Sequence, residues 1–343
     1  MAGLTHYKKE NIIVETSADG IVRKTIRAWF SGSPCDWFPG SSRKRLIIPL
    51  FQRRYLWGED QCRRLFEDGL KSGKSLGRVM VQCNSKNELI IVDGQQRATT
   101  LMLLLASLQK RGSAEVSDIL FFKGTPTLQP TYHDKEPFNA VIENKNAVGE
   151  SHIVQASLWF DSWTSVLTKQ DANKMTQNLL DHFTVLEFMI PLIEEAENLQ
   201  VVYERLAIKS AYGIGRFLNN DRPGINNGVL DLSRNLVLSY FEETKAISLY
   251  HSHWMPLEIM VAENDTVYSQ ETENRFILHL KDFLKKKNWE TSTNADMQSL
   301  EVYSSLKRFM ESENCYDNRD KVISIVQELL NFQRTEDVFK RPL

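Results

Sequence analysis

The chain has 343 residues, of which 42% are hydrophobic and 25% charged, and its 42 basic and 44 acidic residues leave a formal net charge of −2. This composition is typical of a globular protein with one or two domains, and it excludes a disordered chain and a polybasic coat protein for nucleic acid. The sequence shows no secretory signal and no apolar segment as long as a membrane helix, and its four cysteines lack C-x-x-C spacing. We therefore expect a soluble intracellular protein with no membrane partner, cytoplasmic, or nuclear in a eukaryote. The oligomeric state is left open.

The first part of the chain is predicted to be a small mixed α/β region. The expected elements are a strand at 45–50, a helix at 60–71, a hairpin of strands at 78–83 and 88–92, a helix from Gly94, and a strand at 119–122. The helix from Gly94 is apolar almost all round, so it should be buried. Residues 11–30 fit a helix or a strand equally well, and the prolines after residue 125 predict interrupted structure.

The second part of the chain is predicted to be mostly helical. The expected elements are helices at 152–168 and 172–182, a strand at 185–190, and helices at 195–207, 230–241, 243–262, 268–287, 295–312 and 318–333. Residues 209–228 are rich in Gly and Asn and are expected to form a loop. We expect an α+β protein with a mixed α/β domain at 1–145. A helical region at 146–343 would pack on that domain and complete a cleft.

Residues 48–57 (IPLFQRRYLW) are the first candidate functional segment. A strand here runs into two arginines interleaved with aromatic residues. Arginine can form paired hydrogen bonds with phosphate, and tyrosine or tryptophan can stack on a base. The alternative is an ordinary strand end whose arginines extend into solvent. The ten basic and four acidic residues at 43–78 give this part of the chain a local charge of +6, which the net charge conceals.

Residues 91–100 (IVDGQQRATT) are the second candidate, because a strand ends and a helix begins within two residues. A helix N-terminus presents free N–H groups and partial positive charge, and Gly94 allows a tight turn and close approach of a ligand. Such a turn suits a phosphate. The alternative is that Asp93 only caps the helix and that Arg97 is a surface side chain.

A third candidate lies at residues 230–235 (LDLSRN), where Asp231 can cap a helix that carries Arg234 and Asn235 in its first turns. Taken by itself, this segment is better explained as a capped helix with a polar face. No P-loop, dinucleotide-binding motif or zinc-ligand spacing is present.

Together these segments resemble the N-terminal domain of GmrSD-type restriction endonucleases, a family of the ParB/sulfiredoxin-like superfamily. The runs I-P-x-F-Q-R-x-Y-x-W and I-V-D-G-Q-Q-R-x-T-T-L carry the resemblance. Later landmarks follow in the family's order: L-Q-P-T-Y-H-D-K-E-P-F (128–138), Y-E-R-L (203–206), L-D-L-S-R-N (230–235) and H-W-M-P-L-E (253–258). The resemblance covers about residues 45–290 and implies a ParB/sulfiredoxin-like fold for the first domain.

The resemblance also implies where the site lies. The catalytic residues would be Asp93, Gln96 and Arg97, with Asp93 as the ligand of Mg²⁺ or another divalent cation. The residues expected to bind nucleotide or phosphate are Gln52, Arg53, Tyr55, Gly94, Gln95, Thr99, Thr100, Asp231, Arg234 and Asn235. The family usually has Asn where this chain has Ala207, so any role of that Asn is missing here.

The activity implied is Mg²⁺-dependent binding and hydrolysis of a nucleoside triphosphate, linked to recognition or cleavage of DNA as in modification-dependent restriction. The expected partners are a nucleoside triphosphate, DNA and a separate nuclease subunit. A separate subunit is expected because residues after 290 include no histidine for a His-Asn-His nuclease domain. Two alternatives stay open: a non-catalytic switch that binds nucleotide or DNA, and a relic that keeps the fold without a ligand. Whether the chain is an enzyme is therefore undecided from sequence.

Overall fold

The computed structural model divides the chain into two compact units, unit 1 (Met1–Ile193) and unit 2 (Glu194–Leu343). The residues that it describes are 14–16, 21–31, 45–50, 52, 54–83, 88–147, 149, 151–189, 228–241, 243–263, 270–289 and 299–332. Unit 1 combines a β-sheet with helices, and the described part of unit 2 is helical. This arrangement confirms the α+β class.

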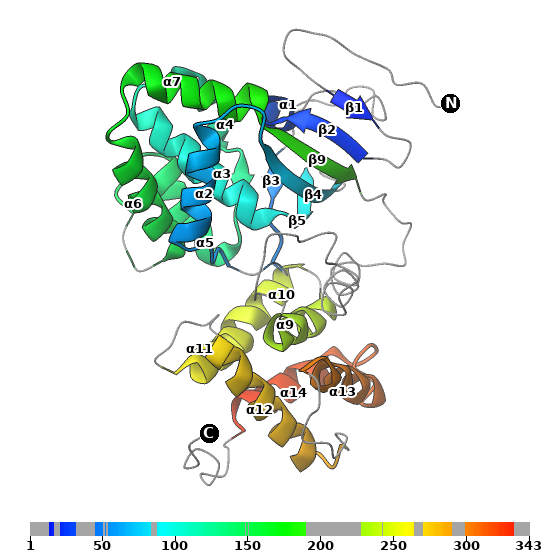
Figure 1. The fold of residues 1–343 in the computed structure, drawn as a ribbon. Helices are drawn as coiled ribbons and strands as arrows, with labels where there is room; N and C mark the ends of the chain where they lie inside the picture. Colours follow the sequence, from blue (N-terminus) through cyan, green and yellow to red (C-terminus); the bar gives the residue numbers. More distant parts are fainter. Residues whose placement is uncertain are drawn as a thin grey trace. The chain divides into compact units, whose positions relative to one another are not determined.

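Unit 1 is built on a mixed sheet whose described strands run in the order β1-β2-β9-β4-β5-β3-β8. Figure 1 labels the first six of these strands. The strands are β1 (Val14–Thr16), β2 (Ile21–Thr25), β3 (Leu46–Ile47), β4 (Ser75–Cys83), β5 (Leu89–Asp93), β8 (Leu128–Gln129) and β9 (Thr184–Met189). Strands β4 and β5 form the predicted antiparallel hairpin, and β3 runs parallel to both β5 and β8. A separate small hairpin joins β6 (Phe121–Phe122) to β7 (Thr125–Pro126).

Helices cover the sheet of unit 1 and supply most of its core. They are α1 (Ile26–Ser31), α2 (Glu59–Gly69), α3 (Gln95–Lys110), α4 (Ser117–Leu120), α5 (Tyr132–Ile142), α6 (His152–Thr164) and α7 (Lys169–Gln177), with a 3-10 turn at Ala114–Val116 and a π-helical turn at Asn178–His182. Helix α3 is central: it packs against α2, α5 and α6, and its residues Leu101 to Leu105 are fully buried. The burial predicted from its apolar sequence is confirmed.

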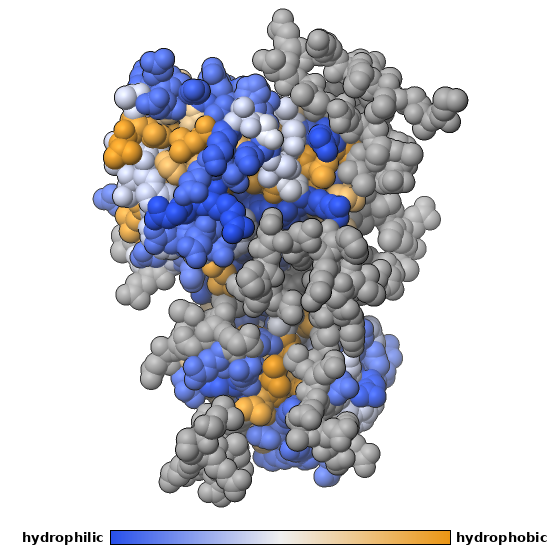
Figure 2. Space-filling model, in the orientation of Figure 1, coloured by the Kyte–Doolittle hydropathy of each residue, from blue (hydrophilic) through white to orange (hydrophobic). Residues whose placement is uncertain are grey.

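Helix α2 shows how sequence pattern sets burial at the surface of this unit. Cys62 and Leu65 face the core, whereas Arg63, Arg64 and Glu67 are exposed. Figure 2 shows hydrophilic residues over the part of unit 1 where Figure 1 places α2. An apolar stripe with a charged opposite face is the pattern of a helix that lies on a core.

Two ion pairs fasten the N-terminal strands to the rest of unit 1. Lys24 of β2 places its Nζ 2.5 Å from Oε1 of Glu187 in β9, and both side chains are buried. Arg27 of α1 donates from Nε to Oδ1 of Asp181 at 2.5 Å and from Nη2 to Oδ2 at 3.0 Å. Residues 11–30, which the sequence left open between helix and strand, include strand β2 and most of helix α1.

Unit 2 contains helices α9 (Val229–Ser239), α10 (Glu243–Leu249), α11 (Met255–Ala262), α12 (Gln270–Lys286), α13 (Ser299–Ser312) and α14 (Arg319–Leu330), with a π-helical turn at Tyr250–Trp254. Helix α9 packs against α12 and α13. His279 of α12 lies with its Nε2 2.9 Å from the carbonyl oxygen of Leu329 in α14. Across the described part of the chain, no helix combines the length and the apolar character needed to cross a membrane.

Most elements predicted in unit 2 and around α3 are confirmed. Three predicted elements of unit 1 differ from the structure. The strand expected at 119–122 is wrong for Ile119 and Leu120, which belong to α4, because a short apolar run does not distinguish helix from strand. Helix α5 was not predicted because of its prolines, yet Pro137 lies inside it. The strand expected at 45–50 is limited to Leu46–Ile47. The predicted helix at 195–207 and nearly all of the loop at 209–228 lie outside the described residues.

The first compact unit extends to residue 193, beyond the boundary at 145 that was expected from the change to helical pattern. Helix α6 packs on α3, and β9 pairs with both β2 and β4. Helix α6 and strand β9 both follow residue 145, so this later segment completes the core and the sheet of unit 1.

Gly94 makes the turn from β5 into α3. Its backbone is left-handed, with φ +98°, and a Cβ atom built on it would lie 2.6 Å from Cγ1 of Val79. Both the conformation and the close approach of β4 therefore require glycine.

We predict that Gly94→Ala lowers the free energy of unfolding by about 3 kcal/mol, because the left-handed backbone and the contact with Val79 both oppose a methyl group. Urea titration followed by circular dichroism measures this change. Gly124→Ala is the matched control: Gly124 has φ +77° but no atom within 4 Å of a built Cβ. Its expected cost is about 1 kcal/mol. Equal costs at the two positions would contradict a steric requirement at Gly94.

Candidate functional site

Three segments of unit 1 meet at one edge of the sheet. Strands β5, β3 and β8 are neighbours and run parallel, so their carboxyl ends lie together. Strand β5 leads into α3, β8 leads into α5, and β3 leads into the segment at 48–58. In open α/β sheets, ligands bind outside the carboxyl ends of the strands. The first two candidate segments of the sequence therefore lie at an edge where a ligand site is expected.

The first turn of α3 has no side-chain cap at its N-terminus. Its N-cap, Gly94, has no side chain to accept a hydrogen bond from the first N–H groups, and the first helical bond runs from Ala98 N–H to the Gly94 carbonyl at 3.0 Å. The preceding N–H groups of a helix have no carbonyl partner within the helix. They give this end a partial positive charge that favours an anion.

Asp93 and Arg97 flank this turn and contact each other weakly. Arg97 Nη2 lies 3.5 Å from Asp93 Oδ2, and Nη1 donates to the Leu76 carbonyl at 3.5 Å. The Arg97 guanidinium lies against the backbone of Gly77, since a Cβ atom built on Gly77 would lie 2.6 Å from Arg97 Nη1. Arg97 Nε is buried and has no hydrogen-bond partner in the described part of the chain, while half of the Asp93 side chain is exposed. Both charged groups keep capacity for further hydrogen bonds.

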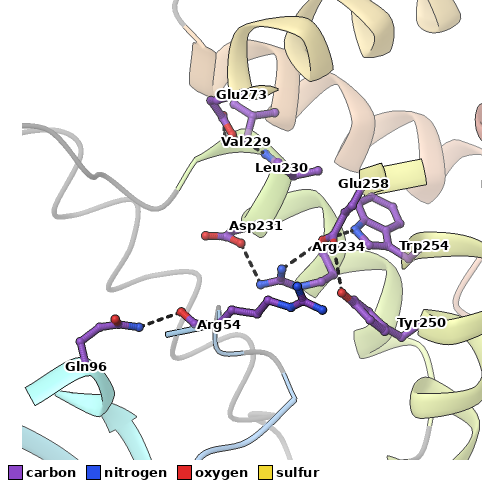
Figure 3. Close-up of polar contacts among 10 residues, drawn as sticks. All are labelled: Arg54, Gln96, Val229, Leu230, Asp231, Arg234, Tyr250, Trp254, Glu258 and Glu273. Atoms are coloured by element: carbon purple, nitrogen blue, oxygen red, sulfur yellow. Dashed lines mark hydrogen bonds and ion pairs between the residues drawn. The ribbon is translucent and has the colours of Figure 1, made fainter. Parts of the chain in front are cut away.

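The two glutamines of the motifs hold the turn together. Gln96 donates from Nε2 to the Arg54 carbonyl at 2.8 Å (Figure 3). It also accepts at Oε1 from the Leu56 N–H at 2.8 Å. Gln52 donates from Nε2 to the Val92 carbonyl at 2.5 Å. The two side chains thus bind main-chain groups, and they fasten residues 52–56 to the end of β5 and the start of α3.

Tyr55 and Thr100 lie beneath the turn, in the core. The Tyr55 hydroxyl is 2.7 Å from Thr100 Oγ1, which donates to the Gln96 carbonyl at 2.7 Å. Burial raises the pKa of Tyr55 well above its ordinary value, so the phenol is neutral. Thr99 is also buried, as is Gln95. These buried residues pack against the first turn of α3 from the core.

Asp134, which sequence reasoning assigned no role, joins α5 to the same segment. Its Oδ2 accepts from the Tyr55 N–H at 2.6 Å and from the Thr131 hydroxyl at 3.2 Å. Burial raises the pKa of Asp134 from 3.8 to about 6, against the lowering effects of the Tyr55 N–H and of the Arg54 charge. The available signal was its place in the motif at 128–138.

The residues near this turn bear on whether a metal ion would fit. Within the described ranges, no group of three or more His, Cys, Asp or Glu side chains could hold a metal ion. Mg²⁺ in nucleotide sites is held by one or two carboxylates together with substrate phosphates and water. The half-exposed Asp93 fits a magnesium ion carried by a nucleotide rather than a resident metal.

The third candidate segment forms a buried network in unit 2. Arg234 contacts Asp231 Oδ1 at 2.9 Å and Glu258 Oε1 at 3.2 Å. Glu258 also accepts from the Tyr250 hydroxyl at 2.7 Å and from Trp254 Nε1 at 3.0 Å (Figure 3). Arg234 is only 1% exposed. Its charge is therefore balanced by carboxylates of its own unit.

The N-terminus of α9 is occupied by a side chain of the protein. Glu273 accepts from the N–H groups of Val229 and Leu230. Burial and the nearby Asp231 charge raise the pKa of Glu273 to about 7. A carboxylate thus fills the position that an external anion would take at this helix. Asn235 is buried in the same helix, and Arg53 lies outside the described residues.

The raised pKa of Asp134 predicts a pH dependence of stability. An acid whose pKa is higher in the folded state than in the unfolded state lowers the free energy of unfolding at high pH, where it must ionise in the folded protein. This penalty disappears at low pH, because the acid is then protonated in both states. In Asp134→Asn the amide oxygen still accepts from Tyr55 without ionising. We expect the unfolding free energy of the variant, minus that of the wild type, to rise by about 2 kcal/mol between pH 4 and pH 7.

Chemical denaturation at a series of pH values measures this difference. Asp118→Asn, at an exposed position in α4, is the control for the loss of one negative charge. A pH-independent difference for Asp134→Asn would show that Asp134 titrates normally in the folded chain.

Comparison with known proteins gives one family. The model of the GmrSD restriction endonuclease N-terminal domain matches residues 36–211, which include both sequence motifs of the β5–α3 edge. The segments at 230–235 and 253–258 lie beyond the match. No curated protein matches the chain. The family supports a role in a restriction system, and because the match spans more than half of the 343 residues, the chain belongs to the GmrSD restriction endonuclease N-terminal domain family.

Proposed function

We propose that unit 1 binds a nucleoside triphosphate, as its magnesium complex, at the turn between β5 and α3 and hydrolyses it in connection with recognition or cleavage of DNA. One observation carries this proposal: Asp93 and Arg97, whose mutual contacts are long, flank the first turn of α3, which has no side-chain cap. A carboxylate, a guanidinium and helix N–H groups at one point are the groups that phosphate-transfer chemistry needs.

The phosphate would bind at the N-terminus of α3. Helix N–H groups supply hydrogen bonds in a fixed direction, and Arg97 adds a full positive charge beside them. Gly94 has no side chain in the path of a phosphate. Arg53, the arginine of the family motif, is proposed as a further phosphate ligand.

Asp93 would serve the magnesium ion or the attacking water. Its carboxylate is half exposed, so a ligand can reach it, and its contact with Arg97 is long enough to be exchanged. A magnesium ion bound there would neutralise charge on the phosphates. In hydrolysis, Asp93 would orient a water molecule toward the terminal phosphorus.

The other motif residues act as positioning residues in this proposal. Both amides, of Gln52 and Gln96, bind backbone groups, and Tyr55 and Thr100 lie in the core. These residues would fix the first turn of α3 against the segment at 52–56. The network of Arg234 is given a structural role in unit 2, because its charge is already balanced there.

The geometry also favours a second candidate, a switch that binds a nucleotide without hydrolysing it. Gln96, the motif residue most suited to orient a water, has both amide groups engaged by backbone. Under this candidate the nucleotide would stabilise one state of the protein. DNA and a separate nuclease subunit are proposed as partners in both cases, and the local charge of +6 at 43–78 is the feature that supports DNA.

We predict that Asp93→Asn lowers the rate of phosphate release about 100-fold or more, since the amide neither holds magnesium nor orients water as well. Arg97→Ala should weaken nucleotide binding about 10- to 100-fold, because a charge-assisted hydrogen bond is lost. Phosphate release with Mg²⁺, with and without DNA, and calorimetric titration of each nucleoside triphosphate measure these effects.

Arg64→Ala is the matched control, because Arg64 is exposed on α2 and is also a basic residue of the 43–78 segment. It should leave nucleotide binding, and phosphate release in the absence of DNA, unchanged. If nucleotides bind the wild type but no phosphate is released, the switch is supported. If neither wild type nor variants bind any nucleoside triphosphate, both candidates fail.

A further inference from the structure

Strand β4 contains a β-bulge at the place where Arg97 contacts this strand. The register between β4 and β9 shifts between Ser75 and Gly77, which leaves Leu76 as an extra residue in β4. A bulge is rare between parallel strands, and bulges are frequent next to functional sites, where they redirect a group of the chain. The side chain of Leu76 is buried in the core, and the bulge lies outside both sequence motifs.

Local contacts hold this bulge in shape. The Ser75 hydroxyl accepts a hydrogen bond from the Gly77 N–H and donates one to the Thr184 carbonyl of β9, both at 3.1 Å. Gly77 has φ +91°, a left-handed backbone conformation that favours glycine. The Leu76 carbonyl accepts from Arg97 Nη1 at 3.5 Å. The extra residue of the bulge therefore contacts a side chain of α3.

The position of the Arg97 guanidinium requires that residue 77 has no side chain. A Cβ atom built on Gly77 would lie 2.6 Å from Nη1 of Arg97 and 3.8 Å from its Cζ. With Nη1 at the bulge, Nη2 lies 3.5 Å from Asp93 Oδ2, beside the first turn of α3. A guanidinium is planar and rigid, so a fixed Nη1 also fixes the direction of the donors on Nη2. The bulge therefore sets the direction from which Arg97 can bind an anion.

A second bulge of the same sheet is used in a similar way. The register between β4 and β5 shifts so that Val92, directly before Asp93, is the extra residue. The Val92 carbonyl accepts from Gln52 Nε2 at 2.5 Å. At both bulges, the carbonyl of the extra residue thus accepts from a polar side chain of a family motif.

We propose that Gly77 is a positioning residue of the nucleotide site, and that the bulge around it directs Nη2 of Arg97 at a phosphate bound at the N-terminus of α3. This inference rests on the proposed function of the β5–α3 turn and adds a residue of β4 to that site. Gly77 contacts no ligand in this arrangement and acts only through Arg97. A methyl group at residue 77 would displace the guanidinium, because the end of an arginine side chain moves more easily than a paired strand.

A double-mutant cycle between Gly77 and Arg97 tests the inference by calorimetric titration of ATP, GTP and inorganic tripolyphosphate, each with Mg²⁺. Gly77→Ala should weaken binding about tenfold, because a charge-assisted hydrogen bond to phosphate is misdirected. In the Arg97→Ala background, the same substitution should change the affinity by less than about twofold, since the group through which Gly77 acts is absent. A merely structural role of Gly77 would give the same loss in both backgrounds.

Gly73→Ala is the matched control. Gly73 precedes β4 and has φ +76°, but a Cβ atom built on it would meet no atom within 4 Å. The control therefore carries a similar backbone strain without a contact to Arg97, and it should leave the affinity unchanged. Thermal unfolding of each variant confirms that it is folded.

Ser75→Ala is a second test that keeps glycine at residue 77. It removes both hydrogen bonds of the Ser75 hydroxyl and should weaken binding about threefold, because the bulge is held less firmly. Ser75→Thr keeps a hydroxyl and should bind the probes as the wild type does. If Gly77→Ala does not fold, this pair of variants decides.

The outcomes distinguish this inference from the function on which it rests. If Arg97→Ala weakens binding, but Gly77→Ala and Ser75→Ala bind the probes normally, the positioning role is overturned and the proposed function stands. A loss in Gly77→Ala that persists undiminished in the Arg97→Ala background would also overturn the positioning role. If the wild type binds none of the probes, the inference and the proposed function fall together.

Discussion

Two glutamine side chains tie the segment after β3 to the beginning of α3, and the geometry of the candidate site depends on these bonds. Gln52 binds the Val92 carbonyl, and Gln96 binds an N–H and a carbonyl of residues 54–56. A primary amide suits this place, because it donates and accepts at once and carries no charge whose burial would oppose folding. Asp134 extends the same network to α5. The N-termini of two helices are thereby held at one edge of the sheet.

The charged groups of the two units differ in burial and in pairing, and this difference follows from the cost of desolvating a charge. At the edge of unit 1, Asp93 and Arg97 keep solvent or long contacts. In unit 2, Arg234 is buried between carboxylates, and Glu273 closes the N-terminus of α9. A buried charge without partners is strongly unfavourable, and the charge of Arg234 is paired with carboxylates of its own unit. The groups of unit 1 that keep hydrogen-bonding capacity are the ones that we propose for a ligand.

Much of the site could be predicted because its signals are local. The hairpin of β4 and β5, the turn at Gly94 and the buried α3 all follow from alternation, a glycine and an unbroken apolar run. Helix α5 and Asp134 could not be predicted in the same way. Pro137 argued against a helix, and a carboxylate bonded to the main chain of Tyr55 leaves no pattern in the sequence. The same limit applies to β2, which pairs with β9 and whose Lys24 contacts Glu187, 163 residues away in the chain.

The sequence by itself determined the α+β class, the family and the strand-to-helix turn with Asp93, Gly94 and Arg97, because each depends on residues close together in the chain. Only the tertiary structure decided which polar residues of the motifs are free for a ligand. The amide of Gln96 has the same chemistry whether it faces a nucleotide or the backbone of Arg54. Partners distant in sequence settle that question, because a hydrogen-bonding group that the fold has already used is not available to a ligand.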